Sequence, residues 1–376
     1  LNLKPAKGPN IRSTNDDVLG KLPQVPFIKT LRLYRKKQKA LSTYVTPYLH
    51  GNNDSNVEDD GKVHTTYLIH GTATGRLSSR EPNLQNIPRD PAIRGMFVAR
   101  PGRMFIEPDL NQAELRSLAI LSEDPVLCQV YLDGKESLHE VTRRGIFGNP
   151  SDWSPSDVEG FLQKFNIPPD ERYINGEDRI KAEQKMIAKN VNFGIIYGIT
   201  EAGLSEQTGQ EPKDCREWLT GWASTYPVAW KFIQTCRMAS LFGKNIVTVF
   251  GYRKRFEIVT REKLTDIQNE SANFPHQSTA SVITMHGGIR TYKKIEEHDC
   301  YFINTVHDSL LIDAPLDYHV ARTVTDLVTA ELEQVPKDWG LTKIPFKADA
   351  KWGTKWGSLT DDQEAFARSQ GWLEAA

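Results

Sequence analysis

MFIEPDLNQAELR, residues 104–116, holds the pattern from which we interpret the whole chain. Its first apolar residues, Met104 to Ile106, predict the end of a short buried strand, and Asp109 follows just beyond that strand. Apolar residues then recur at helical spacing and predict a helix over residues 112–121. Asp109 is therefore a candidate metal ligand, held rigidly at a strand end. The alternative is that Asp109 only caps the helix, a position at which Asp is strongly preferred.

A second stretch, YFINTVHDSLLIDAP at residues 301–315, predicts a β-hairpin with His307 and Asp308 at its turn. Apolar residues flank this pair on both sides, and a buried carboxylate without a partner would cost several kcal/mol. A charged pair between such strands therefore indicates function rather than packing. We interpret Asp109 and Asp308 as catalytic and metal-binding residues of one shared site.

Two carboxylates at neighbouring strand ends suit a pair of Mg²⁺ ions, which prefer oxygen ligands and keep several waters and substrate phosphates. Two such ions about 4 Å apart activate an attacking hydroxyl and stabilise the leaving oxygen of a phosphoryl transfer. The two carboxylates by themselves fit a two-metal nuclease and a polymerase equally well.

Composition limits the class of protein. At 376 residues, with 39% hydrophobic and 25% charged residues, the chain has the size and balance of a soluble protein with two or three subdomains. It has no apolar run of about 18 residues and no signal peptide at its start, so we expect no membrane partner and a cytoplasmic location. The four cysteines are widely scattered, which favours a reducing compartment over a disulfide framework.

The net charge of −1 hides a strongly basic N-terminal segment. Residues 1–50 contain ten Lys and Arg residues and only two acids. Four of the basic residues follow three-four spacing and predict one stripe along a helix; they are Lys29, Arg32, Lys36 and Lys39. We favour contact between this stripe, Lys36 in particular, and a phosphate backbone. A solvated helix face is the alternative.

A predicted helix over residues 183–197 carries Lys185, Lys189, Phe193 and Tyr197 at intervals of four. Each four-residue step turns the helix by only about 40°, so all four side chains share one slowly winding face. Two ammonium groups followed by two aromatic rings match the phosphates and the flat base of a nucleotide. We therefore predict nucleotide binding by this face, with packing of the aromatic rings in the core as the alternative.

Four motifs together resemble those of the family A DNA polymerases, the group that includes bacterial DNA polymerase I and many phage replicases. The motifs are TATGRLSSREPNLQNIP at 72–88, DLNQAELR at 109–116, K-x3-K-x3-F-x3-Y-G at 185–198 and VHDS at 306–309. They occur in the family order, and the similarity extends from about Ile11 to Trp356. The resemblance implies a template-directed DNA polymerase that adds deoxynucleotides to a primer 3′-hydroxyl by two-metal phosphoryl transfer.

The resemblance also implies an α+β right-hand fold with an antiparallel palm sheet, helical fingers and a partial thumb. We assign residues 1–66 to the thumb, 67–137 to the first part of the palm, 138–257 to the fingers, and 258–376 to the second part of the palm and a C-terminal tail. Residues 148–178 look like an insertion. The implied partners are primer–template DNA, deoxynucleoside triphosphates and two Mg²⁺ ions, for a monomer in a bacterial or phage-infected cell. Because the thumb is short, an inactive nucleic-acid-binding module stays open as an interpretation beside the nuclease.

For nucleotide binding, the resemblance implies that His139 and Lys189 contact the triphosphate and that Phe193 stacks near the sugar and base. A Phe ring offers no hydroxyl to replace a missing ribose 3′-hydroxyl, and similar enzymes with Phe discriminate against dideoxynucleotides. An ordinary surface histidine is the alternative for His139. Lys185 stands where an Arg is usual, which keeps the charge but loses bidentate phosphate geometry. Glu114 would fill the space of a ribose 2′-hydroxyl, or else be a helix-surface residue paired with Arg116 or with a lysine elsewhere.

We assign six residues to DNA contacts: Arg76, Asn273, Gln277, His307, Lys36 and Arg253. Asn273 and Gln277 lie four apart on a predicted helix that we expect to be interrupted near Pro275. Their amides suit hydrogen bonds to the minor groove, and the resemblance places them at the primer terminus and nearby template. A helix cap or a turn is the alternative for Asn273. Arg253 lies in a basic turn, from which it would contact the template backbone.

Ser309 departs from the family pattern, since many relatives have a Glu directly after the catalytic His-Asp pair. Glu107, two residues before Asp109, would point the same way on a regular strand and would supply a third carboxylate, unless Pro108 spoils the geometry. The aromatic residues of 201–245 are expected in a helical core. At the C-terminus, residues 346–350 predict a last palm strand, and the final dozen residues are interpreted as a tail to which the sequence assigns no role.

Overall fold

The structure, a computed structural model, describes residues 14, 16–20, 22, 25–49, 55–174, 176–256, 260 and 263–373. Its chain divides into two compact units. The smaller unit comprises Leu1–Leu68, Ser78–Val98 and Lys355–Ser358, and the larger unit comprises Ile69–Leu77, Ala99–Thr354 and Leu359–Ala376. The larger unit contains every residue of the predicted catalytic and nucleotide sites.

The smaller unit contains α2 (Pro26–Ala40), which begins at a proline, a residue favoured at the first helical position. α1 (Asp16–Gly20) lies against it, where Asp16 and Arg32 form an ion pair of 2.8 Å. Arg32 is therefore engaged, whereas the other members of the predicted basic stripe are exposed. The other elements of this unit are η1 (Leu41–Val45), η2 (Thr46–Tyr48), β1 (Thr66–Leu68), β2 (Ser78–Arg80), α3 (Pro91–Arg94) and η5 (Trp356–Ser358).

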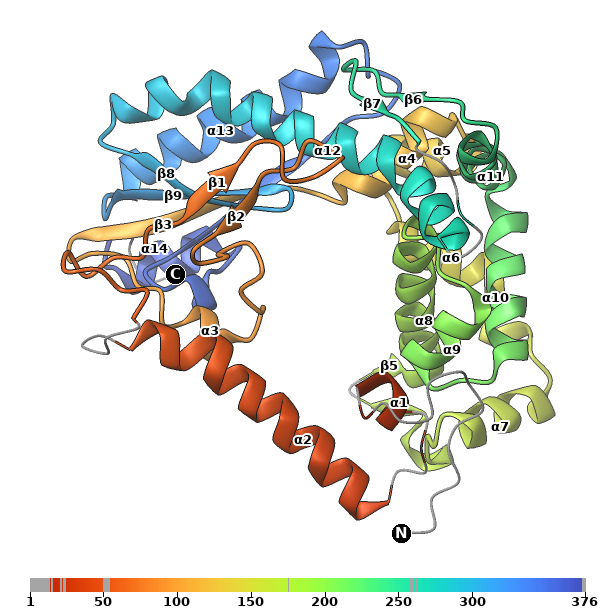
Figure 1. Ribbon diagram of the computed structural model, residues 1–376. Coiled ribbons are helices and arrows are strands. Elements are labelled where there is room, and N and C mark those ends of the chain that lie inside the picture. The colour runs from red at the N-terminus through yellow and green to blue at the C-terminus, as the bar shows by residue number, and fades with distance from the viewer. Residues whose placement is uncertain are drawn as a thin grey trace. The chain divides into compact units, whose positions relative to one another are not determined.

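The larger unit is organised around a four-stranded antiparallel sheet, as expected. Its strand order is β10 (Ala348–Gly353), β3 (Arg103–Leu110), β9 (Ser309–Pro315) and β8 (Tyr301–Val306). α12 (Leu264–Glu296) and α13 (Tyr318–Asp338) cover one face of this sheet (Figure 1). Ile106, Ile312 and Trp352 are cross-strand neighbours on the covered face and are fully buried. Their burial fixes the register, since a one-residue slip would turn all three toward the other face.

β3 is longer than predicted and includes Asp109 itself. The strand pairs with β10 through Pro108, which lies opposite Ala350. On its other side, β9 pairs with Arg103–Ile106 and then again at Asp109, opposite Ser309. Because proline has no N–H to donate, the break in pairing at Pro108 is expected, and the strand continues beyond it.

The helix after this strand is α4 (Ala113–Ser122), and its N-cap is Gln112. Asp109 belongs to the strand and does not cap the helix, so the capping alternative for Asp109 is wrong. Gln112 adopts the left-handed conformation with φ 52°, and its side-chain oxygen accepts a hydrogen bond of 3.0 Å from the Tyr131 hydroxyl. This sharp change of direction carries the chain from the sheet straight into a buried helix.

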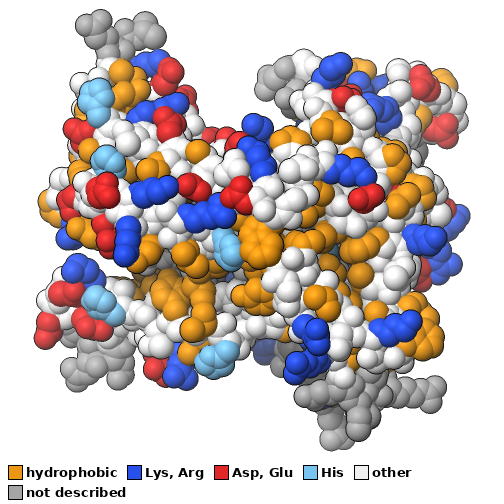
Figure 2. Space-filling model, turned by 90° about the horizontal axis from the view of Figure 1, so that it is seen from above, with side chains coloured by type: hydrophobic (Ala, Val, Ile, Leu, Met, Phe, Trp, Pro, Cys, Tyr) orange, Lys and Arg blue, Asp and Glu red, His pale blue; other side chains and the backbone are white. Residues whose placement is uncertain are grey.

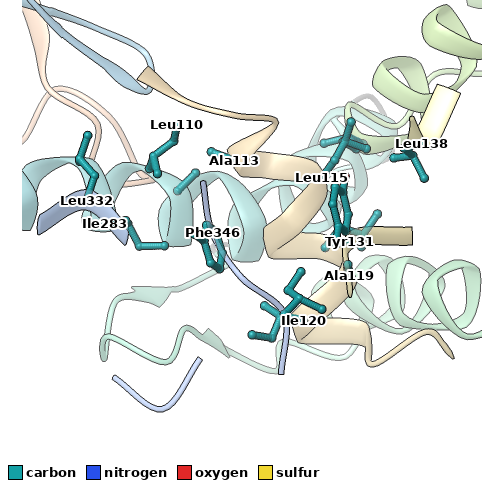
Figure 3. Close-up of a cluster of buried hydrophobic side chains, with 14 of the residues drawn as sticks. Leu110, Ala113, Leu115, Ala119, Ile120, Tyr131, Leu138, Ile283, Leu332 and Phe346 are labelled. Carbon is teal, nitrogen blue, oxygen red and sulfur yellow. The ribbon is translucent and has the colours of Figure 1, made fainter. Parts of the chain in front are cut away.

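Helices form the rest of the larger unit. They are α5 (Pro125–Asp133), α6 (Leu138–Phe147), α7 (Pro155–Lys164), α8 (Arg179–Ile196), α9 (Glu201–Thr208), α10 (Pro212–Thr225) and α11 (Pro227–Leu241). Trp222 and Tyr226 are fully buried, which confirms that the aromatic residues of 201–245 build a core. Figure 3 shows one part of the continuous hydrophobic core, where Leu110 and Ala113 lie near Ile283 and Phe346. The core therefore joins strand β3 to the long helix α12.

The predicted interruption near Pro275 is wrong, because α12 runs unbroken for 33 residues with Pro275 inside it. Proline in a helix interior costs about 3 kcal/mol. Phe274 and Ile283 are among many buried residues of this helix, and burial of one such side chain contributes about 1.5–3 kcal/mol. Packing over the whole helix outweighs the local cost.

Residues 148–178 contain helix α7, whose N-terminus has a capping box between Ser154 and Asp157. This segment has a small hydrophobic cluster of Phe161, Leu162 and Ile167, which packs with Ile180 at the start of α8. This cluster therefore packs part of the segment against α8. Short paired strands complete the unit: β4 (Tyr173–Ile174) with β5 (Glu177–Asp178), and β6 (Ile246–Val247) with β7 (Arg253–Lys254).

The C-terminal prediction needs two corrections. The last strand starts at Ala348, two residues later than expected, and continues to Gly353. The expected tail forms α14 (Gln363–Ser369), and Trp372 packs against Phe366 with ring centroids 5.8 Å apart. Across the described residues, every helix is too short or too polar to cross a bilayer. On the face drawn in Figure 2, basic and acidic side chains are interspersed, in keeping with the near-zero net charge.

Candidate active site

The two predicted catalytic carboxylates lie on neighbouring strands. Asp109 on β3 is the cross-strand partner of Ser309, the first residue of β9, and Asp308 directly precedes it in the hairpin turn. The Leu110 backbone N–H lies 3.5 Å from the Asp308 carbonyl oxygen. The register of one pair of strands therefore brings together two acids from distant parts of the sequence.

His307, the other residue of this turn, has a φ of 56°. A residue other than glycine is rarely found in this left-handed region, which costs of order 1 kcal/mol or more. Such conformations concentrate at functional sites, where the surrounding structure holds them. Here the paired strands β8 and β9 hold the turn on both sides.

Arg76 joins Asp308 to Glu114. Its guanidinium donates to a Glu114 carboxylate oxygen and lies 3.1 Å from Asp308 Oδ1. All three side chains are largely buried. Burial alone would lower the pKa of Arg76, but the charges of Asp308 and Glu114 outweigh burial and raise that pKa. Glu114 is thus buried and paired with Arg76, so the surface-residue alternative for Glu114 is wrong.

Gly75 lets the chain place Arg76 here. Its φ is +79°, and a Cβ atom at this position would lie 2.7 Å from the ring of Tyr252. A side chain would be both strained and in steric conflict with that ring. The Gly-Arg pair of the TATGR motif therefore has a physical reason: the glycine permits the turn and the arginine enters the carboxylate site.

Tyr197 reaches the same cluster from the end of α8. Burial raises the pKa of its hydroxyl to about 12, and a hydrogen bond with Glu114 adds to the effect. His276 on α12, which our sequence analysis overlooked, is fully buried near Glu114 and Arg76. Burial lowers the pKa of His276 to about 4. Its neighbours Gln277, Ser278 and Thr279 are polar as well, so no local pattern in the sequence marks His276 as buried.

The side chains around Asp109 offer oxygen atoms that could bind a metal ion. Ser309 Oγ lies 3.3 Å from a Glu107 carboxylate oxygen, so Glu107 does stand beside the position where relatives have a third acid. Across the described part of the chain, no set of three or more His, Cys, Asp or Glu side chains is arranged to hold an ion. Two carboxylates nevertheless fit Mg²⁺, which fills most of its coordination from water and phosphates.

Four residues of α8 line one exposed face, as predicted. Lys185 and Lys189 are exposed, Phe193 is 36% exposed and Tyr197, at the helix C-cap, is 45% exposed. Most of the residues between them, such as Ala188 and Asn192, are buried, whereas Met186 is exposed. The alternative that the two aromatic rings pack in the core is therefore wrong.

His139 on α6 lies beside this face. Its ring centroid is 5.8 Å from that of Phe193, and its Nδ1 atom is 3.0 Å from the amide nitrogen of Asn192. Burial, together with the charges of Lys189 and Lys185, lowers the pKa of His139 to about 4. His139 is half-buried and bonded to α8, so it is not an ordinary surface histidine.

The predicted DNA-contact residues lie on several elements. Asn273 is inside α12, so it caps no helix, and its buried Oδ1 atom has no hydrogen-bond partner within the described structure. Gln277 lies one turn further along the same helix and is partly exposed. Arg253 on β7 is exposed, whereas its neighbour Lys254 pairs with Glu270 at 2.6 Å.

Lys36 is exposed on α2 of the smaller unit, as are Lys29 and Lys39. Four further basic residues counted in the N-terminal segment lie outside the described residues: Lys4, Lys7, Arg12 and Lys21. The structure thus presents the predicted stripe of α2 to solvent, except at Arg32.

Comparison with known proteins identifies the protein family to which the chain belongs. Residues 1–157 and 171–358 match the family described as DNA polymerase family A, and the chain belongs to that family. The gap between the two matched ranges, residues 158–170, falls inside the segment that we interpret as an insertion. The chain shares its fold, with a TM-score of 0.73 and 24% identity, with the structure titled "POL domain of Pol1 from M. smegmatis complex with DNA primer-template and dNTP". That similarity covers 95% of this chain and 59% of the other.

Among curated proteins, DNA polymerase I of Caldicellulosiruptor bescii is 31% identical over 357 residues, which are 92% of this chain and 37% of that protein. The thermostable DNA polymerase I of Thermus thermophilus is 28% identical over 362 residues, which are 93% of this chain and 39% of that protein. The chain thus spans little more than a third of the length of these relatives. The predicted α+β polymerase fold is confirmed.

Proposed function

We propose that this chain is the catalytic part of a template-directed DNA polymerase. In the reaction, a primer 3′-hydroxyl attacks the α-phosphate of a deoxynucleoside triphosphate and pyrophosphate leaves. The observation that carries the proposal is the continuous arrangement from Asp109 and Asp308, through Arg76 and Glu114, to Tyr197 on the exposed face of α8. The neighbour titled as a complex with primer-template and dNTP supports the same function.

Asp109 and Asp308 would hold two Mg²⁺ ions, which when bound activate the primer hydroxyl and stabilise the leaving oxygen. Glu107, beside Ser309, is the candidate for a supporting third carboxylate. Arg76 supplies a positive partner to Asp308 in the free protein. The protein's part in such a reaction is mainly positioning and charge neutralisation.

The incoming nucleotide would lie against α8. Lys185 and Lys189 provide positive charge for the triphosphate, and His139 provides a hydrogen bond. Phe193 provides an apolar surface for the sugar and base. Glu114, fixed by Arg76, would occupy the space that a ribose 2′-hydroxyl needs.

DNA would contact the remaining assigned residues. Asn273, Gln277 and Arg76 suit the minor-groove acceptors that all Watson–Crick pairs share, so these contacts test pair geometry without reading sequence. His307, Arg253 and Lys36 are assigned to the DNA strands near the catalytic turn and to the phosphate backbone. The thumb, palm and fingers boundaries, the monomeric state and the cytoplasmic location stay predictions.

Primer extension separates the proposed function from its rivals. With Mg²⁺, all four deoxynucleotides and a labelled primer–template, the wild-type chain should lengthen the primer, and Asp308→Ala should not. A nuclease would shorten the labelled strand instead, and a binding module would shift its mobility without changing its length. The exposed Lys and aromatic face of α8 favours the polymerase, because a nuclease has no use for a triphosphate site.

A further inference from the structure

A chain of buried polar groups lies beneath the exposed face of α8. It links His139 and Thr142 on α6, Asn192 on α8, Trp222 on α10 and Tyr226 at the end of α10. Apart from His139, each of these side chains is 0% exposed. Buried polar groups are costly unless their hydrogen bonds are satisfied, so this network has a defined arrangement of donors and acceptors.

The orientation of the Asn192 amide follows from its contact with Trp222. An indole N–H can only donate, and Trp222 Nε1 lies 2.8 Å from one amide atom of Asn192. That atom must therefore be the amide oxygen, Oδ1. Thr142 Oγ1 also lies 3.1 Å from it, and the Tyr226 hydroxyl is 2.8 Å from Thr142. The amide group of Asn192 cannot be reversed without placing an NH₂ group against the indole N–H.

The other amide atom of Asn192, Nδ2, points to His139. It lies 3.0 Å from His139 Nδ1, and an amide nitrogen carries only donor hydrogens. Nδ1 must therefore accept with its lone pair, and the ring proton of neutral His139 must be on Nε2. A second proton on Nδ1 would set two donors against each other. Burial and the nearby charges of Lys189 and Lys185 oppose that second proton as well.

We propose that Asn192, oriented by Trp222, is a positioning residue that fixes His139 as the neutral tautomer with its proton on Nε2. His139 then offers the triphosphate a hydrogen-bond donor without a charge, while the two lysines supply the charge. The consequence for the nucleotide rests on the proposed function, but the tautomer itself does not. The tautomer can therefore be tested on the free protein.

The first test is ¹⁵N NMR of the full chain labelled at histidine, without DNA or nucleotide, with the His139 signals identified by their loss in His139→Gln. At about pH 6 we expect Nε2 protonated and Nδ1 unprotonated. A proton on Nδ1, or an imidazolium at that pH, would overturn the proposal. A failure of primer extension by the wild-type chain would leave this result standing, so the two proposals fail separately.

Trp222→Phe removes the indole donor and keeps an aromatic ring. We expect it to give a mixture of His139 tautomers, because the Asn192 amide can then reverse. Trp218→Phe is the matched control, since Trp218 is buried on the same helix and packs its ring 5.9 Å from that of Phe147. If the His139 signals of the two variants are the same, the orienting role of Trp222 is wrong.

Asn192→Asp, nearly the same shape, places a carboxylate oxygen against His139 Nδ1. It should move the proton to Nδ1 and raise the pKa of His139 toward the neutral range. We expect KM for the nucleotide to change by about 3- to 10-fold, the scale of one hydrogen bond, with a new pH dependence between about pH 5 and 8. A merely structural role would lower activity equally at every pH, and that outcome would contradict the proposal.

Discussion

The carboxylate side of the site and its nucleotide side are held by different kinds of interaction. On the carboxylate side, the Arg76 guanidinium bridges two acids, Glu114 and Asp308, in a largely buried charged cluster. On the nucleotide side, Asn192 and Trp222 hold His139 through neutral hydrogen bonds. A charged cluster changes its energy when an ion or a charged ligand arrives, whereas a neutral network keeps its geometry. The first side is thus suited to respond to substrate and the second to position it.

Each side also contains one histidine whose pKa is lowered to about 4. For His276, full burial is the largest cause and lowers the pKa, whereas the charge of Glu114 raises it. For His139, burial acts together with the charges of Lys189 and Lys185. Burial is thus the main cause of the lowered pKa for both histidines, but a neighbouring acid opposes it at His276 and neighbouring lysines add to it at His139.

The largest expected effect is on catalysis by the charged side. Asp109→Ala should lower kcat for primer extension by about 10³-fold, because it removes a ligand for the ions that stabilise the transition state. Asp349→Asn is a matched control: Asp349 is the neighbour of Asp109 on β10 and bonds to Asn111. It should change kcat by less than about threefold, as expected for an exposed group outside the reaction. Equal losses in both variants would contradict the assignment of Asp109.

Stability should also depend on this cluster. Arg76→Gln leaves two partly buried carboxylates without their positive partner, and we expect a loss of about 3 kcal/mol in the free energy of unfolding. Urea denaturation measures this change. Arg76→Lys, which keeps the charge but not the planar guanidinium, should recover part of the loss. An unchanged urea midpoint in Arg76→Gln would show that the cluster contributes nothing to the free energy of unfolding.

A third prediction concerns acid sensitivity and the buried histidine of the carboxylate side. His276 has its folded pKa near 4, below the ordinary value of 6.5, so the unfolded chain binds more protons between these values. Stability should therefore fall as the pH is lowered from about 6.5 to 4, by up to about 3 kcal/mol for this residue.

His276→Leu should flatten that slope, measured as the urea midpoint against pH. The exposed His319 on α13 provides the control, and His319→Gln should leave the slope unchanged. A slope equal to that of wild type in His276→Leu would mean that His276 is not the group that titrates.

The smallest of these effects belongs to the nucleotide side. Phe193→Tyr adds a hydroxyl to the exposed face of α8 that can replace the missing 3′-hydroxyl of a dideoxynucleotide. Chain-terminator incorporation relative to the normal nucleotide should rise by about tenfold, the scale of one hydrogen bond. If incorporation of dideoxynucleotides stayed at the wild-type level, Phe193 would not lie over the sugar.

Much of this site could be predicted from local patterns. Apolar residues on both sides of His307 and Asp308 predicted the hairpin, and the four-residue spacing from Lys185 to Tyr197 predicted the exposed face of α8. Both are local patterns, which a sequence displays directly. Both predictions therefore needed only local patterns and no knowledge of contacts between distant segments.

The missed features depend on contacts between distant segments. Pro275 was expected to break a helix, but packing along all of α12 outweighs its local cost. Asn192 was overlooked because its partners come from α6 and α10, and no spacing in the sequence relates these helices. An amide between the apolar residues Val191 and Phe193 was the one available signal of a buried polar network.

The most direct test is a crystal structure of the chain with primer–template, an incoming nucleotide that cannot react, and Mn²⁺ in place of Mg²⁺. We predict anomalous density for manganese in contact with both Asp109 and Asp308, with the triphosphate against the Lys189 face of α8. Density for manganese elsewhere, or the two carboxylates bound to no ion while DNA and nucleotide are present, would contradict the account.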